Sequence, residues 1–186
     1  MVKMRIMKTI FFILLTVFAL ESNAQLHKST LQASGLTCAM CSNAINKALQ
    51  KIPFVATVKS DIKNSSFNIV FKENTKVNID DLKKAVEDAG FSVAKLNVTG
   101  TFNNVHVKND EHVNIDGTTF HFLKVNDQVL TGEKTLIVVD KNFLNSKEFK
   151  KYSDATKMSC LQTGKAASCC VKEGITANTR IYHVTI

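Results

Sequence analysis

Two cysteines, separated by two residues, stand between a short extended segment and a helical pattern. They are Cys38 and Cys41, in the run GLTCAMC at residues 35–41. Backbone N–H groups at a helix N-terminus favour negative charge and lower the pKa of a nearby thiol. Two thiolates from one short loop can converge on a soft ion with a low coordination number, and Cu(I) fits that description better than a harder ion.

The same pair has other interpretations. A Cys-x-x-Cys pair can form a structural disulfide, although closing so short a loop contributes little stability. It is also the spacing of thiol–disulfide oxidoreductases, but the single proline, Pro53, directly follows the first predicted helix and cannot lie opposite the cysteines. A structural zinc site needs four ligands, and no second such pair is present. We therefore expect metal binding by Cys38 and Cys41, no catalytic residue and no enzyme, and we expect Met40 to pack rather than bind metal.

Residues 26–98 contain the elements that would position this loop. Apolar residues recur at helical spacing after Cys41, and Pro53 ends that pattern. Asn78 is a plausible N-cap for a second helix, and Gly90 is a natural residue to follow it. The predicted elements are a strand (29–34), a helix (41–52), a hairpin (55–71), a second helix (78–89) and a strand from 91. This order predicts an α+β domain of the ferredoxin-like βαββαβ type.

Motif and element order together resemble the heavy-metal-associated domain of copper chaperones, copper-transporting P-type ATPases and periplasmic mercury-binding proteins. That family carries Gly-Met-Thr-Cys-x-x-Cys after the first strand, and Leu36 replaces the methionine here. The resemblance implies metal ligation by Cys38 and Cys41, with Phe91 in a loop near the metal. Thr37, where zinc- and cadmium-preferring relatives often carry an acid, favours Cu(I). Hg(II) is the main competing ion, since it also prefers two thiolates.

Residues 99–186 show a different pattern, with a boundary in the glycine- and asparagine-containing segment 97–104. Strand-like runs follow at 105–107, 118–125, 135–139 and 179–186, with a short helix at 142–151. Asp116-Gly117 is a strong hairpin turn signal. We expect a mainly β domain of unknown function, with a small barrel as one arrangement. Nothing in it resembles a catalytic triad or a phosphate loop.

Three further cysteines, Cys160, Cys169 and Cys170, lie before the last predicted strand. In an oxidising compartment we expect one disulfide, from Cys160 to Cys169 or Cys170, which leaves an odd thiol. A second soft-metal site or a thiol relay is the alternative.

The histidines show no recognisable metal-binding spacing. His106, His112, His121 and His183 lie far apart along the chain, without a His-Glu-x-x-His motif or a close pair. We therefore expect no metal site among them.

Residues 1–24 have the pattern of a signal peptide. A basic start precedes the 11-residue apolar run Ile10–Leu20, and Ser22-Asn23-Ala24 supplies small residues for cleavage before Gln25. The apolar run is shorter than the roughly 18 residues that span a bilayer. We expect a periplasmic or secreted protein without stable membrane insertion after cleavage. Its net charge of +8 is dispersed, which argues against a nucleic-acid partner and leaves a metal-transport or efflux protein as the expected partner.

Overall fold

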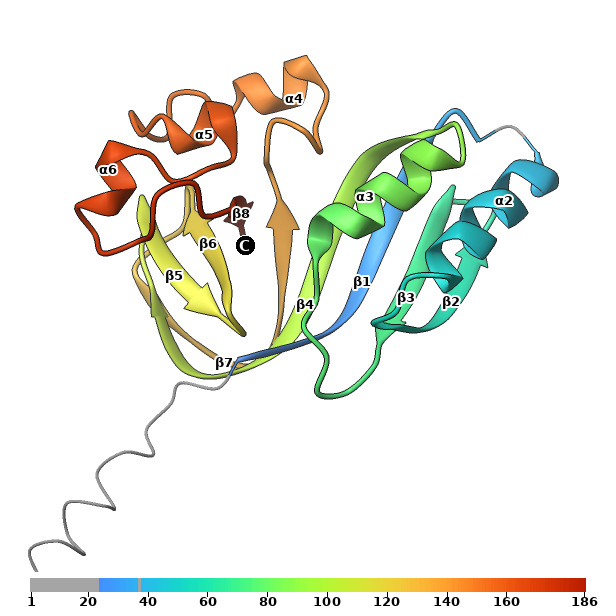
Figure 1. Ribbon diagram of the computed structural model, residues 1–186, viewed down its shortest axis with the longest axis horizontal. Coiled ribbons are helices and arrows are strands. Elements are labelled where there is room, and N and C mark those ends of the chain that lie inside the picture. The colour runs from blue at the N-terminus through green and yellow to red at the C-terminus, as the bar shows by residue number, and fades with distance from the viewer. Residues whose placement is uncertain (1–23, 37) are drawn as a thin grey trace, which may run out of the picture.

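The computed structural model describes residues 24–36 and 38–186, so the predicted signal segment lies outside the described residues except for Ala24. Its strands form one mixed eight-stranded sheet in the order β2-β3-β1-β4-β7-β8-β6-β5 (Figure 1). The elements are β1 (Gln25–Ser34), α2 (Ala39–Gln50), β2 (Val55–Asp61), β3 (Ser66–Phe71), α3 (Ile79–Asp88), β4 (Ser92–Val107), β5 (Glu111–Ile115), β6 (Thr118–Phe122), β7 (Gln128–Val138), α4 (Ser146–Lys150), α5 (Cys160–Thr163), α6 (Ser168–Val171) and β8 (Ile181–Thr185).

The first half of the sheet has the predicted ferredoxin-like arrangement. Strands β2, β3, β1 and β4 lie side by side, and each neighbouring pair is antiparallel. Helices α2 and α3 cover one face of these strands (Figure 1). The apolar stripe of α2 supplies Ile45 and Leu49, both fully buried, and that of α3 supplies Leu82 and Val86. Helical spacing thus places one apolar face of each helix against the sheet, which confirms this part of the prediction.

Strand β4 continues past the segment that the sequence suggests as a boundary. It pairs with β1 over residues 92–101 and with β7 over residues 97–107, so 97–104 is strand rather than linker. The two asparagines that suggested a linker, Asn103 and Asn104, lie at a register shift between Phe102 and Val105, where Asn104 has a φ of 53°. An asparagine tolerates such a conformation at a bulge, so the strand bends without ending.

The second half extends the same sheet in place of a separate small barrel. Among the described strands, β2 and β5 form the two edges of the sheet and do not pair with each other. The hairpin predicted at Asp116-Gly117 is present between β5 and β6, and both turn residues have positive φ angles, as a type I′ turn requires. The last strand, β8, inserts between β7 and β6 and is parallel to β6. One apolar core runs through both halves, from Leu31 to Val184.

An arginine before β8 fastens the second half to α3. Arg180 donates from Nε and Nη2 to the two carboxylate oxygens of Asp80 at 2.8 and 3.0 Å, and Asp80 lies in the first turn of α3. Its Nη1 also donates to Oδ2 of Asp140 at 2.7 Å. Asp140 is only 1% exposed, so loss of this cation would leave its carboxylate buried without the guanidinium that pairs with it. Tyr182 extends the junction by donating from its hydroxyl to Oδ1 of Asn78 at 3.1 Å.

We expect Arg180→Met to lower the free energy of unfolding by about 3 kcal/mol, because it leaves the buried Asp140 carboxylate without its cation. Urea denaturation measures this change. Lys84→Met is the matched control: it removes an exposed helix pair with Asp88 and should cost less than about 0.5 kcal/mol. Equal costs for the two variants would show that Arg180 does not hold the junction.

Candidate metal centre

Cys38 and Cys41 lie at the start of α2, as predicted. Cys38 is the N-cap residue, with an extended backbone (φ −150°, ψ 159°), and its Sγ accepts the backbone N–H of Cys41 at 3.3 Å. Hydrogen bonds from the Cys41 side chain and backbone hold the pKa of the Cys38 thiol below its usual range. Cys38 is exposed and Cys41 is half-buried. The loop therefore presents sulfur at the positive end of a helix, where a thiolate is favoured and accessible.

The residues around the cysteine pair shape the loop. Gly35 has a φ of +80°, a conformation that favours glycine, and turns the chain out of β1. Leu36 is half-buried and packs against the main core. Thr37 lies outside the described residues. Met40 is 83% exposed, so the expectation that it packs against the protein is wrong.

Phe91 is held beside this loop by the end of α3. The Gly90 N–H donates to the Glu87 carbonyl at 2.9 Å, and the Phe91 N–H donates to the Val86 carbonyl at 3.1 Å. These two bonds form a Schellman motif, with Gly90 at a φ of +87°. Ser34 pairs with Ser92 in the β1–β4 ladder, so Phe91 and Gly35 come from adjacent strand ends. Phe91 is partly buried against the core, at the end of the sheet that carries the cysteine loop.

A second group of potential ligands lies in the other half of the sheet. His112 of β5 pairs with His121 of β6, and His121 pairs with His183 of β8. The rings of His112 and His121 stack at 4.2 Å between centroids, and those of His121 and His183 lie 5.2 Å apart. Three histidines thus stand side by side on adjacent strands, contrary to the expectation that they form no site.

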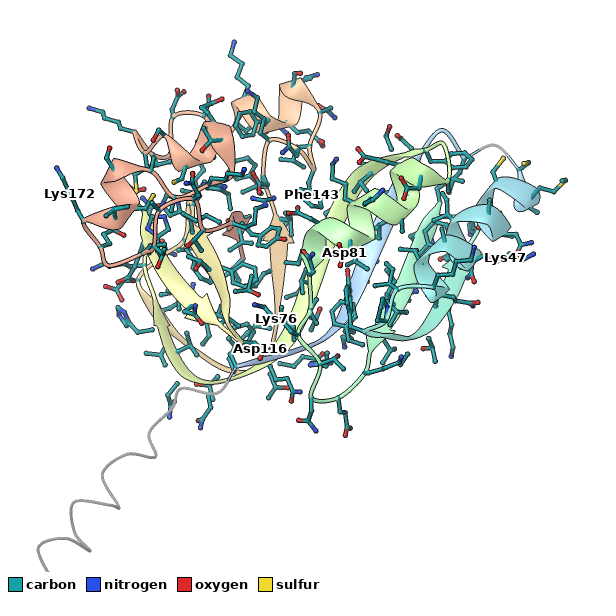
Figure 2. The ribbon with its side chains drawn as sticks, viewed as in Figure 1. Lys47, Lys76, Asp81, Asp116, Phe143 and Lys172 are labelled. Atoms are coloured by element: carbon teal, nitrogen blue, oxygen red, sulfur yellow. The ribbon has the colours of Figure 1, made fainter. Side chains whose placement is uncertain are left out.

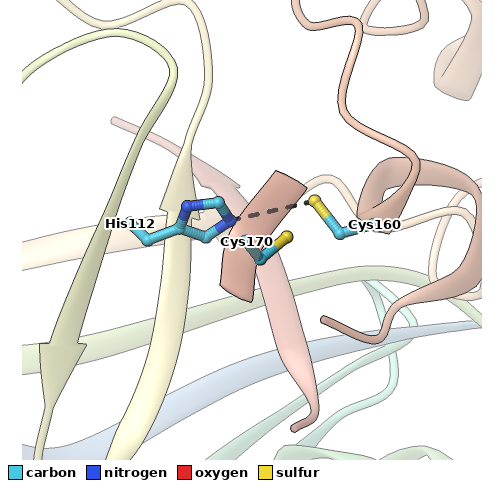
Figure 3. Close-up of side chains that lie close together, drawn as sticks. All are labelled: His112, Cys160 and Cys170. Carbon is cyan, nitrogen blue, oxygen red and sulfur yellow. Dashed lines mark hydrogen bonds between the residues drawn. The ribbon is translucent and has the colours of Figure 1, made fainter. Parts of the chain in front are cut away.

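Two cysteines from short helices face these rings. Cys160 of α5 has its Sγ 3.8 Å from Nε2 of His112 (Figure 3). The same Sγ lies 3.7 Å from Nδ1 of His121. Cys170 of α6 lies with Cys160 and His112 in a group whose ligand atoms are all within 4.8 Å of one another. Cys160, Cys169 and Cys170 are free thiols in the structure, so the expected disulfide is not formed there.

Burial favours the uncharged forms of His121 and Cys160. Desolvation lowers the pKa of His121 to about 3, reinforced by His112 and His183 and opposed by Asp110. Burial likewise raises the pKa of the Cys160 thiol far above its usual range. The His121 ring therefore presents a lone pair rather than a positive charge, which is the form in which imidazole binds metal. Sequence reasoning gave a second soft-metal site at the three cysteines as an alternative but missed its histidines. His112 and His121 meet in the β5–β6 hairpin, and His183 joins them through the long-range pairing of β6 with β8.

The first site and its fold define a small ferredoxin-like domain with a Cys-x-x-Cys loop. Residues 30–92 match the family described as the heavy-metal-associated domain. The chain is 30% identical over 63 residues to the copper chaperone CopZ of Staphylococcus haemolyticus, covering 34% of this chain and 91% of that protein. The chain therefore belongs to the heavy-metal-associated domain family through this segment.

Larger proteins match over the same segment. A copper-transporting ATPase of Helicobacter pylori is 35% identical over 68 residues, which is 37% of this chain. The chain spans only 9% of that ATPase, and 8% of a probable copper-transporting ATPase of Arabidopsis thaliana. Among solved structures, oxidized MerP from Ralstonia metallidurans CH34 is 27% identical to this chain. The match covers 38% of this chain and 96% of MerP, with a TM-score of 0.35.

We expect Gly90→Ala to lower the free energy of unfolding by about 1–2 kcal/mol, since a side chain at positive φ strains the Schellman motif. No atom outside the adjacent residues lies within 4 Å of the added Cβ, so the cost is conformational. Urea denaturation measures it. Gly90→Asn is the control, because asparagine tolerates this conformation better. If alanine costs no more than asparagine, the backbone at Gly90 is not the constraint.

Proposed function

We propose that this protein is an exported heavy-metal carrier that binds Cu(I) between Cys38 and Cys41 and passes it to a partner. The observation that carries the proposal is the position of the Cys38 sulfur, which accepts the Cys41 N–H at the first turn of α2. Two thiolates at a helix N-terminus, without fixed third and fourth ligands, match the low coordination number of Cu(I). Membership of the heavy-metal-associated family supports the same assignment.

Exposure of the loop suits transfer rather than storage. Cys38 is exposed and Met40 extends 83% of its surface to solvent, so a partner can approach the metal from outside. An incoming thiolate adds to the open coordination sphere and one of the two original sulfurs leaves, so the ion moves without being released to water. A metal-transport or efflux protein with its own thiolates is the partner that this chemistry requires. Relatives named as a copper chaperone and copper-transporting ATPases support that class.

The carrier has more support than a thiol–disulfide oxidoreductase with the same pair. The single proline of the chain, Pro53, follows α2, whereas Cys38 precedes it. A 12-residue helix is about 18 Å long, so this proline lies far from the cysteines. A thioredoxin-like site needs a proline opposite the pair, and this chain has no other to place there.

Export is the part of the proposal that rests on sequence. Residues 1–24 have the basic start, apolar run and small residues of a cleavable signal, which would place the carrier in the periplasm or outside the cell. Across the described residues, none of the helices has the length and apolar character needed to cross a bilayer. Gln25 opens β1, so cleavage before it would leave the whole sheet intact.

Replacing both loop cysteines should remove one equivalent of tightly bound Cu(I) per chain. The mature chain and its Cys38→Ser/Cys41→Ser variant are titrated anaerobically with Cu(I) against a chromophoric chelator. Met40→Leu and Cys169→Ser are matched controls, one changing the sulfur residue within the loop and the other a cysteine elsewhere. Both should keep that equivalent.

Competition identifies the cargo in the same assay. Cu(I) should displace Zn(II) and Cd(II) from the loop, because two thiolates favour the softer ion of low coordination number. If Hg(II) binds and Cu(I) does not, the protein is a mercuric-ion carrier. If the double variant binds as much Cu(I) as the unchanged chain, the loop is not the site.

As a carrier, the protein should not reduce insulin disulfides faster than its own Cys38→Ser variant. Reduction of insulin by dithiothreitol, followed by turbidity, measures this, with a thioredoxin as the positive control. A rate that depends on Cys38 would favour the oxidoreductase.

A further inference from the structure

The cluster in the second half contains more hydrogen-bond acceptors than protons to satisfy them. A carboxylate contacts one nitrogen of each ring: Glu173 lies 2.6 Å from Nδ1 of His112, and Asp110 lies 2.9 Å from Nε2 of His121. Asp140 lies 3.4 Å from Nδ1 of His183. Since a carboxylate accepts, each of these nitrogens carries the ring proton. In the neutral form of each ring, the other nitrogen is then a bare lone pair.

These lone pairs converge on one buried thiol. Cys160 is within 3.8 Å of a ring nitrogen of both His112 and His121, but its single S–H proton can serve only one of them. Nε2 of His183 is buried and has no hydrogen-bond partner among the described residues. His121, Cys160 and His183 are fully buried, so bulk solvent does not reach them. Unsatisfied acceptors around a buried thiol indicate a place for a cation.

Two overlapping groups of three potential ligands share Cys160. The ligand atoms of His121, Cys160 and His183 all lie within 4.8 Å of one another, and so do those of His112, Cys160 and Cys170. Around tetrahedral Zn(II), a nitrogen and a sulfur ligand lie roughly 3.6 Å apart. The Cys160–His121 distance of 3.7 Å is already close to that value. The carboxylates behind the rings are the outer partners that commonly orient metal-binding histidines.

We propose that Cys160, His121 and His183 bind a structural Zn(II) ion, and that Cys170, which the structure groups with Cys160 and His112, moves toward them as the ion binds and becomes the fourth ligand. Two thiolates balance the charge of Zn(II), which matters in an interior that penalises net charge. The thiol protons of Cys160 and Cys170 pass to the buffer as the ion enters. Two thiolates with two imidazoles form a closed set of the kind that structural zinc sites use.

The surrounding chain explains what such an ion would do. Between β7 and β8 the described elements are three helices of only four or five residues, and the two cysteine-bearing ones pack over the sheet in a small cluster of their own. A metal joining α5 and α6 to β6 and β8 would fasten this weakly structured segment to the sheet. Its binding energy would then stabilise the folded state directly.

This site is independent of the copper loop. Three inter-strand steps separate β1 from β8 and four separate it from β6, which is about 14–19 Å across the sheet. Lys47 on α2 and Lys172 at the end of α6 lie at opposite ends of the molecule (Figure 2). The two sites cannot share an ion, and the assignment of one does not depend on the assignment of the other.

The test uses the mature chain with Cys38→Ser/Cys41→Ser, reduced and freed of metal, so that failure of the copper proposal does not affect it. Co(II) serves as the optical probe for Zn(II). One equivalent should give the intense visible bands of tetrahedral Co(II) together with a thiolate charge-transfer band, and Zn(II) should bleach both. Zn(II) should also raise the melting temperature and protect residues 139–180 from proteolysis.

Variants separate ligation from folding. Cys160→Ser or His183→Gln should abolish the Co(II) spectrum. Cys170→Ser should lower the intensity of the thiolate charge-transfer band, because it removes one of the two thiolates. Asp110→Asn changes a partly exposed partner of His121 and should weaken Zn(II) binding by about 10–100-fold in a folded protein. Cys169→Ser and His106→Gln are matched controls that should bind as before. The proposal is overturned if the starting protein binds no Zn(II), binds Cu(I) alone, or binds Zn(II) equally after Cys160→Ser.

Discussion

The continuous pairing of β4 is the constraint on which the rest of the structure depends. This strand pairs with β1 on one side and with β7 on the other, so its backbone hydrogen bonds join the two halves of the sheet. Gly100 lies where both ladders overlap, and a Cβ there would come within 2.8 Å of the Gln25 carbonyl oxygen. The absent side chain lets β1 begin close against β4. Because the two halves share a sheet and a core, residues 99–186 extend the same sheet and core that position the cysteine loop.

The two sulfur clusters use opposite physical environments. Cys38 is exposed at a helix N-terminus, where hydrogen bonds from Cys41 lower its pKa and a partner can reach it. Cys160 is fully buried among imidazoles, where desolvation raises its pKa and excludes a partner. Exposure favours ligand exchange, whereas burial in a closed shell favours retention. One chain can thus hold a transferable ion at one end and a permanent one at the other.

Local chemistry made the first half predictable from sequence. Pro53 ends one helical pattern, Asn78 begins another and Gly90 supplies a positive φ, and each acts within a few residues of itself. The turn at Asp116-Gly117 was readable for the same reason. The boundary at 97–104 was misread because Asn103 and Asn104 form a bulge, and a bulge and a linker favour the same residues. Residues 26–98 and 99–186 therefore share strand β4, which crosses the predicted boundary.

The histidine cluster could not be predicted, because its spacing exists only in the folded sheet. His121 and His183 are adjacent solely because β8 inserts between β7 and β6, a parallel pairing between segments far apart in sequence. Two local signals were available: His121 and His183 lie in strand-like runs, where a polar ring must find a partner, and the Asp116-Gly117 turn places His112 opposite His121. The carboxylates that contact one nitrogen of each ring come from elsewhere in the chain. The second nitrogen of each ring has no carboxylate beside it. These second nitrogens, together with the Cys160 thiol, form the candidate ligand set.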